Sequence, residues 1–238
     1  MLRGIVFDMD GVVINSHPAH RQAWQEFLGM FGKQVSEADL DFILEGRKRQ
    51  DILRHFLGDV SERELREYGE KKDELFQRIS DEVLPISGVV ELLQELAQLG
   101  IPAAMATSAS ERRTRLMLNR LDLTHYFRAV VTGDEVAEGK PNPAIYKLAA
   151  QRLQLPVEDL LALEDAPRGV EAAISAGMRC VGVASRTKAD SLRQAGAEYV
   201  IPDFVGVSLD LLENLLNARV VLPTNGQRGH DPSSSPSF

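Results

Sequence analysis

The sequence predicts an α/β fold with a doubly wound parallel sheet. Short apolar runs that suit buried strands alternate along most of the chain with stretches of helical periodicity. Two of these runs end in acidic residues, with Asp8 and Asp10 after the first and Glu164 and Asp165 after a much later one. Because ligands bind at the carboxyl ends of the strands in such sheets, we expect both acidic pairs at one functional edge.

Six runs rich in Val, Ile, Leu and Ala are the expected strands. They cover residues 4–7, 102–107, 129–132, 160–163, 180–183 and 199–201. Helical patterns separate them, for example at residues 89–99 and at residues 144–153, which are bounded by Pro143 and Pro156. This alternation of strand and helix is what predicts a parallel sheet.

The interval after the first strand breaks this alternation. Residues 16–82 contain no strand candidate, and four amphipathic helices are expected at 18–31, 37–44, 47–57 and 61–79. We therefore expect an α/β core from residues 1–15 and 83–222, and a helical cap domain from residues 16–82 that lies over the sheet edge as a lid. Residues 223–238, which include Gly, Pro and three consecutive Ser, are expected to form a disordered tail.

Composition excludes several classes of protein. The 238 residues are 44% hydrophobic and 26% charged, as in an ordinary globular protein, and the net charge of −8 argues against a nucleic-acid surface, which would be basic. The apolar stretch before Asp8 is too short for a signal sequence, and no run is long enough to span a membrane. Cys180 is the single cysteine and is expected to pack in the core. We expect a cytoplasmic monomer without nucleic-acid or membrane partners.

Asp8 and Asp10 give the first indication of chemistry. Residues i and i+2 of an extended backbone project from the same side, so both carboxylates could act on one ligand. Two like charges this close are tolerated mainly where a cation or a shared proton compensates them, and a divalent metal does so most simply. A solvated turn or a helix cap is the alternative interpretation.

Other motifs based on acidic or glycine residues do not fit. An EF-hand loop requires glycine at its sixth position, whereas Gly11 is fourth here. The chain also has no phosphate-binding glycine loop, no dinucleotide fingerprint and no zinc-binding histidine helix. The paired carboxylates therefore remain as the candidate chemistry.

Two further strand ends are polar, at Thr107-Ser108-Ala109-Ser110 and at Gly139-Lys140-Pro141. The Phe-Asp-Met-Asp-Gly motif at 7–11, the strand-terminal serine, the Lys-Pro pair and the later acidic pair, in this order, closely resemble the haloacid dehalogenase (HAD) superfamily of phosphatases and phosphomutases. The resemblance covers residues 1 to about 220 and includes the helical insertion. It implies a Rossmann-like sheet with a helical cap after the first strand.

The resemblance implies roles for the four acids. Asp8 would be the nucleophile that forms an aspartyl-phosphate. Asp10 would protonate the leaving oxygen and then take a proton from the incoming water. The cofactor would be Mg2+, held by the Asp8 carboxylate, the backbone carbonyl of Asp10 and Asp165, with Glu164 orienting its waters.

It also implies three groups that stabilise the phosphoryl oxygens. Lys140 would neutralise Asp8 and the phosphoryl group, while Ser108 and the N–H of Ala109 would donate hydrogen bonds to it. A solvated cation is the alternative for Lys140, and a hydroxyl that caps the following helix is the alternative for Ser108. Thr107 could share the role of Ser108.

The insertion resembles the β-phosphoglucomutase-like branch, which includes sugar-phosphate phosphatases. The segments 20–24 and 46–49 look like cap motifs of this branch, and a later lysine also matches. The implied substrate-binding residues of the cap are His20, Trp24, Gly46, Arg49 and Lys72. Packing in the cap core is the alternative for Trp24, and a solvated helix face is the alternative for Arg49 and Lys72. The histidine couples cap closure to catalysis in the mutases and so does not decide between branches.

Three departures from the mutase pattern favour hydrolysis. Asn15-Ser16 replaces the usual acidic hinge pair, Glu111-Arg112 stands where mutases grip the distal phosphate with Lys-Asn, and the segment 166–169 resembles sugar and glycerol phosphatases. Arg112 could partly compensate the acid beside it and bind substrate. We therefore predict a phosphatase of small sugar or polyol phosphates, with a β-phosphoglucomutase as the second hypothesis. A phospho-accepting receiver protein is the third, although receiver domains lack a helical insertion at this place.

Overall fold

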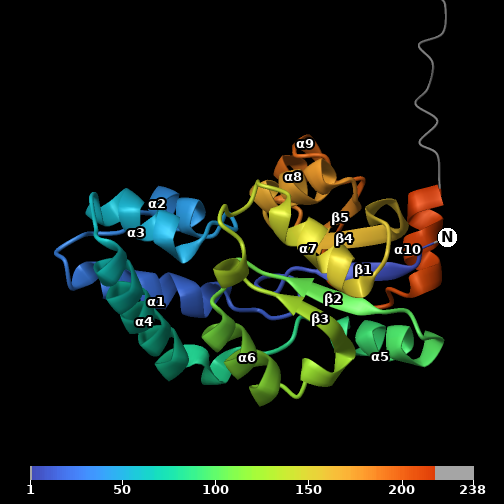
Figure 1. The fold of residues 1–238 in the computed structure, drawn as a ribbon, viewed down its shortest axis with the longest axis horizontal. Helices are drawn as coiled ribbons and strands as arrows, with labels where there is room; N and C mark the ends of the chain where they lie inside the picture. The colour runs from blue at the N-terminus through green and yellow to red at the C-terminus, as the bar shows by residue number, and fades with distance from the viewer. Residues whose placement is uncertain (1, 218–238) are drawn as a thin grey trace, which may run out of the picture.

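The computed structural model describes residues 2–217 and is centred on a six-stranded parallel sheet. The strands are β1 (Gly4–Phe7), β2 (Ala103–Ala106), β3 (Phe127–Val131), β4 (Leu160–Glu164), β5 (Arg179–Val183) and β6 (Tyr199–Ile201). Their spatial order is β3-β2-β1-β4-β5-β6, so the order reverses between β1 and β4 (Figure 1). This arrangement confirms the predicted fold class and places a ligand crevice outside the carboxyl ends of β1 and β4.

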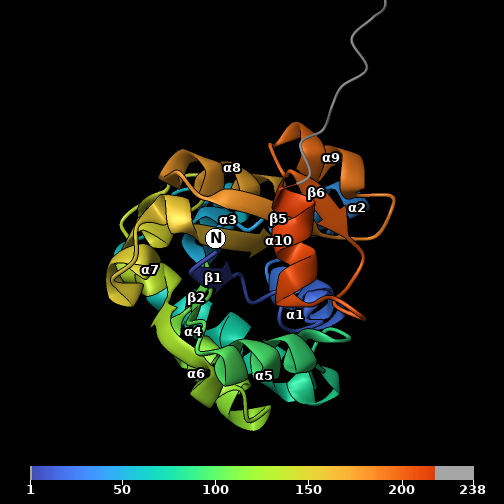
Figure 2. The same ribbon diagram turned by 90° about the vertical axis from the view of Figure 1, so that its right-hand side faces the viewer.

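Helices cover both faces of the sheet. Helices α5 (Val89–Leu99), α6 (Glu111–Arg120) and α10 (Leu209–Asn217) lie on one face, and α7 (Ala144–Leu153), α8 (Pro167–Ala176) and α9 (Ala189–Gln194) lie on the other (Figure 2). Strand β1 serves both layers, because Ile5 and Phe7 pack with the first group and Val6 packs with the second. Four short 3-10 segments complete the described chain: Ser80–Glu82, Thr124–Tyr126, Gly133–Glu135 and Val157–Asp159.

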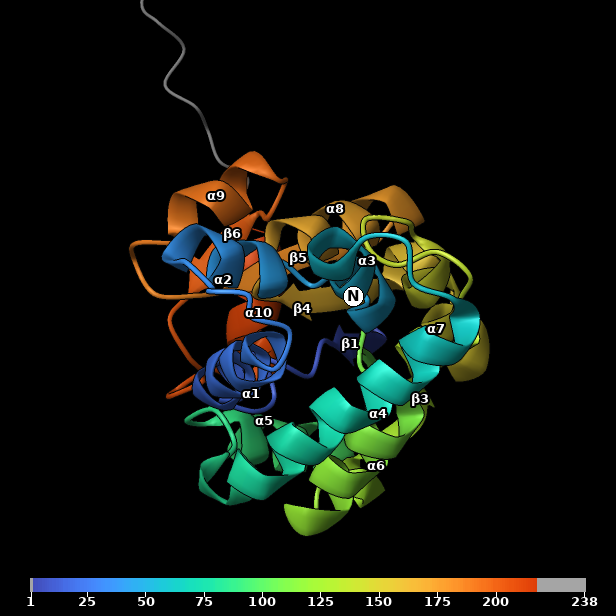
Figure 3. The ribbon, with the colours of Figure 1, turned by 90° about the vertical axis from the view of Figure 1, so that its left-hand side faces the viewer.

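Four helices between β1 and β2 form the predicted helical insertion. They are α1 (His17–Gly29), α2 (Glu37–Ile43), α3 (Arg49–Leu57) and α4 (Glu62–Ile79), and each bound lies within two residues of its predicted place. Helix α4 contacts both α1 and α3, and Phe27 and Phe31 of the α1 region pack against Tyr68 of α4. When the molecule is viewed from the side of these four helices, they lie in front of the sheet (Figure 3).

The two linkers that join this helical segment to the sheet pair with each other. The backbone N–H of Asn15 donates to Leu84 O, that of Ile86 donates to Val13 O, and Ile14 bridges to Pro85. The segment therefore leaves and rejoins the core at adjacent points. The predicted division into a core and a cap of residues 16–82 remains a proposal, which this ribbon supports.

Strand ends differ slightly from the predictions. The third strand was expected at 129–132 but covers Phe127–Val131, because Thr132 starts a capped turn with Glu135. Thr107 was expected within the second strand but follows its end. Cys180 lies buried in β5 as a free thiol, as predicted. The predicted tail at 223–238 lies outside the described residues. Within residues 2–217, the helices are too short or too polar to cross a bilayer.

Candidate active site

Three carboxylates meet where β1 and β4 end. The two strands pair in register up to Phe7 and Leu163, so Asp8 follows one strand where Glu164 ends the other. Oxygen atoms of Asp8, Glu164 and Asp165 all lie within 4.8 Å of one another. Hard carboxylate oxygens are the donors that Mg2+ prefers, so this set fits a divalent cation. Nε2 of His17 lies 3.0 Å from Oδ2 of Asp165. The sequence interpretation did not include His17 in the site.

Lys140 neutralises this cluster from inside the protein. Its Nζ lies 2.8 Å from Asp8 Oδ1, 2.5 Å from Glu164 Oε1 and 3.1 Å from Ala106 O. Burial opposes the charged ammonium, but the two carboxylates prevail and raise the pKa of Lys140. Burial also raises the pKa of Asp8, and the attraction of Lys140 works against that rise. The structure thus brings together the residues predicted for the nucleophile and its counter-cation.

Glu164 is held on all sides. Tyr146 donates its hydroxyl to Oε1 at 2.7 Å, and the N–H groups of Asp165 and Ala166 donate to Oε2 at 3.0 and 3.3 Å. A Cβ at Gly169 would lie only 2.0 Å from the Glu164 carboxyl group, so glycine is needed at that place in α8. These contacts fix Glu164 as a buried carboxylate beside Asp8.

Asp10 faces a different set of partners. It lies in the turn after β1, and Arg113 of α6 donates two hydrogen bonds to its carboxylate at 2.8 and 2.5 Å. Ser16 donates to Oδ1 at 2.6 Å, and Nε2 of His20 lies 3.3 Å from the same oxygen. Burial favours the neutral acid, but Arg113 and His20 outweigh it and hold the pKa of Asp10 well below its usual range. Asp10 is therefore a carboxylate in this arrangement.

The polar loop after β2 connects the core to the helical segment. Ser108 donates its hydroxyl to Gly46 O at 2.7 Å, and Gly46 has a φ of +79° that favours glycine. The N–H of Ala109 donates to Thr107 Oγ1 at 3.1 Å. Ser110, rather than Ser108, caps the following helix by accepting from the N–H of Arg113. Ser108 lines the cavity described below, and the helix-capping alternative for it is wrong.

A cavity joins these groups to the helical segment. From the predicted set, Asp8, Asp10, Ser108, Ala109 and Asp165 line it from the core, and His20, Trp24, Gly46, Arg49 and Lys72 line it from the other side. Lys140 and Glu164 lie buried directly behind Asp8. Four charged or titratable lining residues were not among the predicted site residues, although Arg47 lies in the predicted cap motif at 46–49: His17, Arg47, Asp73 and Arg113.

Two buried bases of the helical segment share a hydrogen bond. Nζ of Lys72 lies 2.9 Å from Nδ1 of His20. Burial, reinforced by the charges of Lys72 and Arg113, lowers the pKa of His20 to about 3. Burial and Arg113 lower the pKa of Lys72 to about 7. At neutral pH the imidazole is uncharged, and the ammonium of Lys72 gives up its proton far more readily than that of an exposed lysine.

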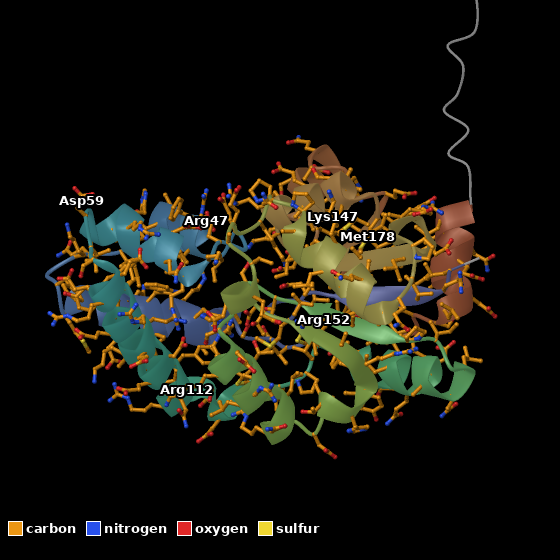
Figure 4. The ribbon with its side chains drawn as sticks, viewed as in Figure 1. Arg47, Asp59, Arg112, Lys147, Arg152 and Met178 are labelled. Carbon is orange, nitrogen blue, oxygen red and sulfur yellow. The ribbon has the colours of Figure 1, made fainter. Side chains whose placement is uncertain are left out.

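The structure does not bring Glu111 and Arg112 into the cavity. Both side chains are exposed at the start of α6, and Glu111 pairs with Arg115 at 2.7 Å. Arg112 lies near the junction of α6 and α4, outside the lining residues, whereas Arg47 lies where the helical segment approaches the sheet (Figure 4). Arg113, the next residue of α6, is the arginine that reaches the site.

Comparisons with known proteins show the family and the fold that this chain resembles. The model of the haloacid dehalogenase-like hydrolase family matches residues 5–183. A phosphorylated carbohydrates phosphatase of Thermotoga maritima is 34% identical over 215 residues, which cover 84% of this chain and 94% of that protein. The β-phosphoglucomutase of Bacillus subtilis is 28% identical over 223 residues, covering 89% and 94%. The crystal structure of CbbY from Rhodobacter sphaeroides in complex with phosphate superposes with a TM-score of 0.78 at 28% identity, covering 90% of this chain and 100% of that one.

Proposed function

Because the chain belongs to the haloacid dehalogenase-like hydrolase family, we propose that it is a Mg2+-dependent phosphatase of small sugar or polyol phosphate monoesters. The family that the strand-end motifs resemble is thereby confirmed, and the relatives include sugar-phosphate phosphatases and a phosphoglucomutase. One observation supports the proposal most strongly. Asp8 is a buried acid that lies 2.8 Å from the ammonium of Lys140, and it lines the cavity between the core and the helical segment.

In the proposed first step, a carboxylate oxygen of Asp8 attacks the phosphorus atom. The bond from Asp8 to phosphorus forms as the bond to the leaving oxygen breaks. Asp10 must first take up a proton from solvent or from the arriving phosphate monoester, and it then gives that proton to the leaving oxygen. Lys140 stays within hydrogen-bond distance of Asp8 and offsets the negative charge that gathers there. The hydroxyl of Ser108, released from Gly46, and the N–H of Ala109, released from Thr107, would then donate to the phosphoryl oxygens.

In the second step, water attacks the aspartyl-phosphate and Asp10 takes one of its protons. The proton lost in the first step is regained in the second, so the cycle balances. The paired contact with Arg113 keeps Asp10 ionised, and an ionised Asp10 is the form that can accept this proton. The structure thus has Asp10 in the state that suits the second step.

We propose that Asp8, the carbonyl of Asp10 and Asp165 hold Mg2+, with Glu164 orienting its waters. The close spacing of three carboxylate oxygens supports this donor set. When bound, the ion would neutralise phosphoryl oxygens that otherwise repel the attacking carboxylate.

The test is phosphate release from a panel of sugar and polyol phosphates with Mg2+ present. We expect turnover in the wild type and a loss of at least about a thousandfold in Asp8→Asn, which keeps the shape of the side chain but removes the nucleophile. Turnover that survives in this variant would refute the assignment of Asp8.

The second hypothesis, a β-phosphoglucomutase, is supported by the relative from Bacillus subtilis. Phosphorus NMR with β-glucose 1-phosphate and a bisphosphate primer separates the two reactions. A phosphatase releases inorganic phosphate, whereas a mutase gives glucose 6-phosphate without it. We expect free phosphate.

A further inference from the structure

Asp73 is a buried acid on the cap side of the cavity. It lies on α4, is 9% exposed and lines the cavity. Arg49 donates to its Oδ2, and Ser110 of the core donates to the same oxygen at 2.8 Å. These two hydrogen bonds do not use the lone pairs of Oδ1. Burial alone would raise the pKa of Asp73, but Lys72 and Arg49 lower it below its usual value, so the group is a carboxylate at neutral pH.

Arg49 is paired with Asp73 through Nη1, while its buried Nε has no hydrogen-bond partner among the described residues. Its guanidinium lies against Gly69 of α4, where a Cβ would approach Nε to 2.4 Å, and it also donates to Gly69 O at 3.3 Å. The arginine therefore lies along α4. Gly69 leaves space for its guanidinium, and Asp73, one turn further along the helix, pairs with it. Its positive charge is matched by Asp73 before any substrate arrives.

The other arginines that line the cavity are matched in the same way. Arg47 pairs with Glu45 at 2.9 Å, and Arg113 pairs with Asp10 at 2.5 Å. Lys72 contacts His20 instead of an acid, and its pKa of about 7 leaves it only partly charged at neutral pH. The cavity is thus rich in hydrogen-bonding groups, but its arginines are each paired with an acid, and Lys140 behind it is paired with Asp8 and Glu164.

A second phosphate group on the substrate would find this end of the cavity unfavourable. It would have to take Arg49 from Asp73, leaving a buried carboxylate unpaired, or lie beside that carboxylate with like charge. A hydroxyl group avoids both costs, because it can donate to Oδ1 of Asp73 and accept from Lys72 or Arg49.

We propose that Asp73 restricts the enzyme to substrates with a single phosphate, by placing a carboxylate beside Arg49 where the far end of the substrate binds. The inference rests on the proposed function for the identity of the substrate class. It adds that the far end of the substrate is a neutral, hydroxyl-bearing carbon chain and that bisphosphates are excluded.

The test compares the binding of two esters that differ by one phosphate. Fructose 1-phosphate and fructose 1,6-bisphosphate are titrated by calorimetry, with Mg2+ present, into Asp8→Asn, which does not turn them over. We expect the monophosphate to bind at least about tenfold more tightly than the bisphosphate. Adding Asp73→Asn should reduce this ratio by about tenfold, mainly through tighter binding of the bisphosphate, because one negative charge is removed beside it.

Two control variants in the same background separate charge at this place from charge in general. Asp73→Glu keeps the carboxylate and should keep the discrimination. Glu70→Gln removes an exposed charge from the same helix and should leave the ratio unchanged. Thermal unfolding of each variant confirms that it is folded.

The outcomes separate this inference from the proposed function. A ratio that is the same with Asp73 and with Asn at this position would overturn the inference, and so would binding of the bisphosphate without binding of the monophosphate. A wild-type protein that releases no phosphate from any ester but shows the expected ratios would overturn the proposed function alone.

Discussion

Lys71 and Lys72 are consecutive residues of α4 in opposite surroundings. Lys71 is 51% exposed and pairs with Glu74, whereas Lys72 is 3% exposed, with its ammonium 5.2 Å from the Trp24 ring centroid and 5.1 Å from that of Phe76. Burial lowers the pKa of Lys72 to about 7. The pKa of lysine in the unfolded chain is far higher. The folded protein therefore holds the proton of Lys72 less tightly than the unfolded chain does.

We predict that Lys72→Met stabilises the protein at pH 7 while weakening substrate binding. The unfolded chain binds more protons than the folded one between pH 7 and the ordinary lysine pKa, so stability rises with pH in this window. Removing the lysine should raise the free energy of unfolding by roughly 1–3 kcal/mol at pH 7, with a smaller gain at pH 10. Urea unfolding at pH 7 and at pH 10 measures this change in the free energy of unfolding.

Lys71→Met is the matched control, and it should change the free energy of unfolding by less than about 0.5 kcal/mol. Destabilisation by Lys72→Met, with KM unchanged, would mean that the buried ammonium contributes to the fold rather than to the ligand.

At the scale of elements, α8 is shaped around a carboxylate of the neighbouring strand. Gly169 lies in its first turn, directly against Glu164 of β4. Glycine within a helix normally costs about 0.5–1 kcal/mol relative to alanine. Here the missing side chain is the space that Glu164 occupies.

Replacing a glycine inside a helix by alanine usually stabilises a protein. We predict that Gly169→Ala destabilises this one. The new methyl group must displace Glu164 from Lys140 and Tyr146, so the free energy of unfolding should fall by about 1–3 kcal/mol and activity by at least about tenfold. Thermal unfolding and phosphate release measure the two effects.

Gly29, the last residue of α1, provides the comparison, because a Cβ there meets nothing within 4 Å. Gly29→Ala should be neutral or stabilise by up to about 1 kcal/mol. Equal effects of the two substitutions would show that Glu164 is not confined as described.

Helix α6 shows where sequence interpretation reached its limit. Strand ends gather at one edge of a parallel sheet, so the positions of Asp8, Glu164 and Asp165 followed from the sequence pattern. The prediction of a strand end at residues 139–141 was wrong, because β3 ends at Val131 and Lys140 lies in the loop that precedes α7. A helical residue points in a direction that depends on where the helix begins, and one residue changes that direction by about 100°. Ser110 starts α6 so that Arg113 faces Asp10 and Arg112 faces outward, and a single sequence without the cap position does not distinguish them.

Asp73 was missed for a related reason. It adjoins Lys72 in a helix rich in charged residues, and nothing in its sequence neighbourhood separates a buried acid from the exposed acids around it. Its role depends on Arg49 from another helix and on Ser110 from the core, which are distant in the sequence.

At the scale of the whole molecule, the acidic cluster lies where the order of the strands in the sheet reverses, between β1 and β4. The chain has a net charge of −8, and Asp8, Glu164 and Asp165 concentrate three acids at one place. A bound divalent cation relieves their repulsion in the folded state only, so it should stabilise the fold.

We predict that Mg2+ at about a hundred times its Kd adds about 2.7 kcal/mol to the free energy of unfolding, which raises Tm by roughly 5–10 °C. Asp165→Asn should remove most of this rise. Differential scanning calorimetry with Mg2+ and then with a chelator measures the shift.

Asp59, an exposed acid at the far end of the helical segment (Figure 4), is the control position. Asp59→Asn should leave the full Mg2+ effect in place. If Mg2+ raised Tm as much in Asp165→Asn as in the wild type, the metal would have to bind somewhere other than this cluster.

The paired linkers of the helical segment have a consequence for how such enzymes diversify. Because Asn15 and Leu84 are hydrogen-bonded neighbours, we expect that the segment between them could be replaced by one of different length without a change in the path of the sheet. With the proposed site residues, the groups that act on phosphorus would remain in the core, and many of the groups that bind the substrate's carbon chain would move with the exchanged segment. A chimaera made at these two positions would inherit its chemistry from one parent and its choice of sugar largely from the other.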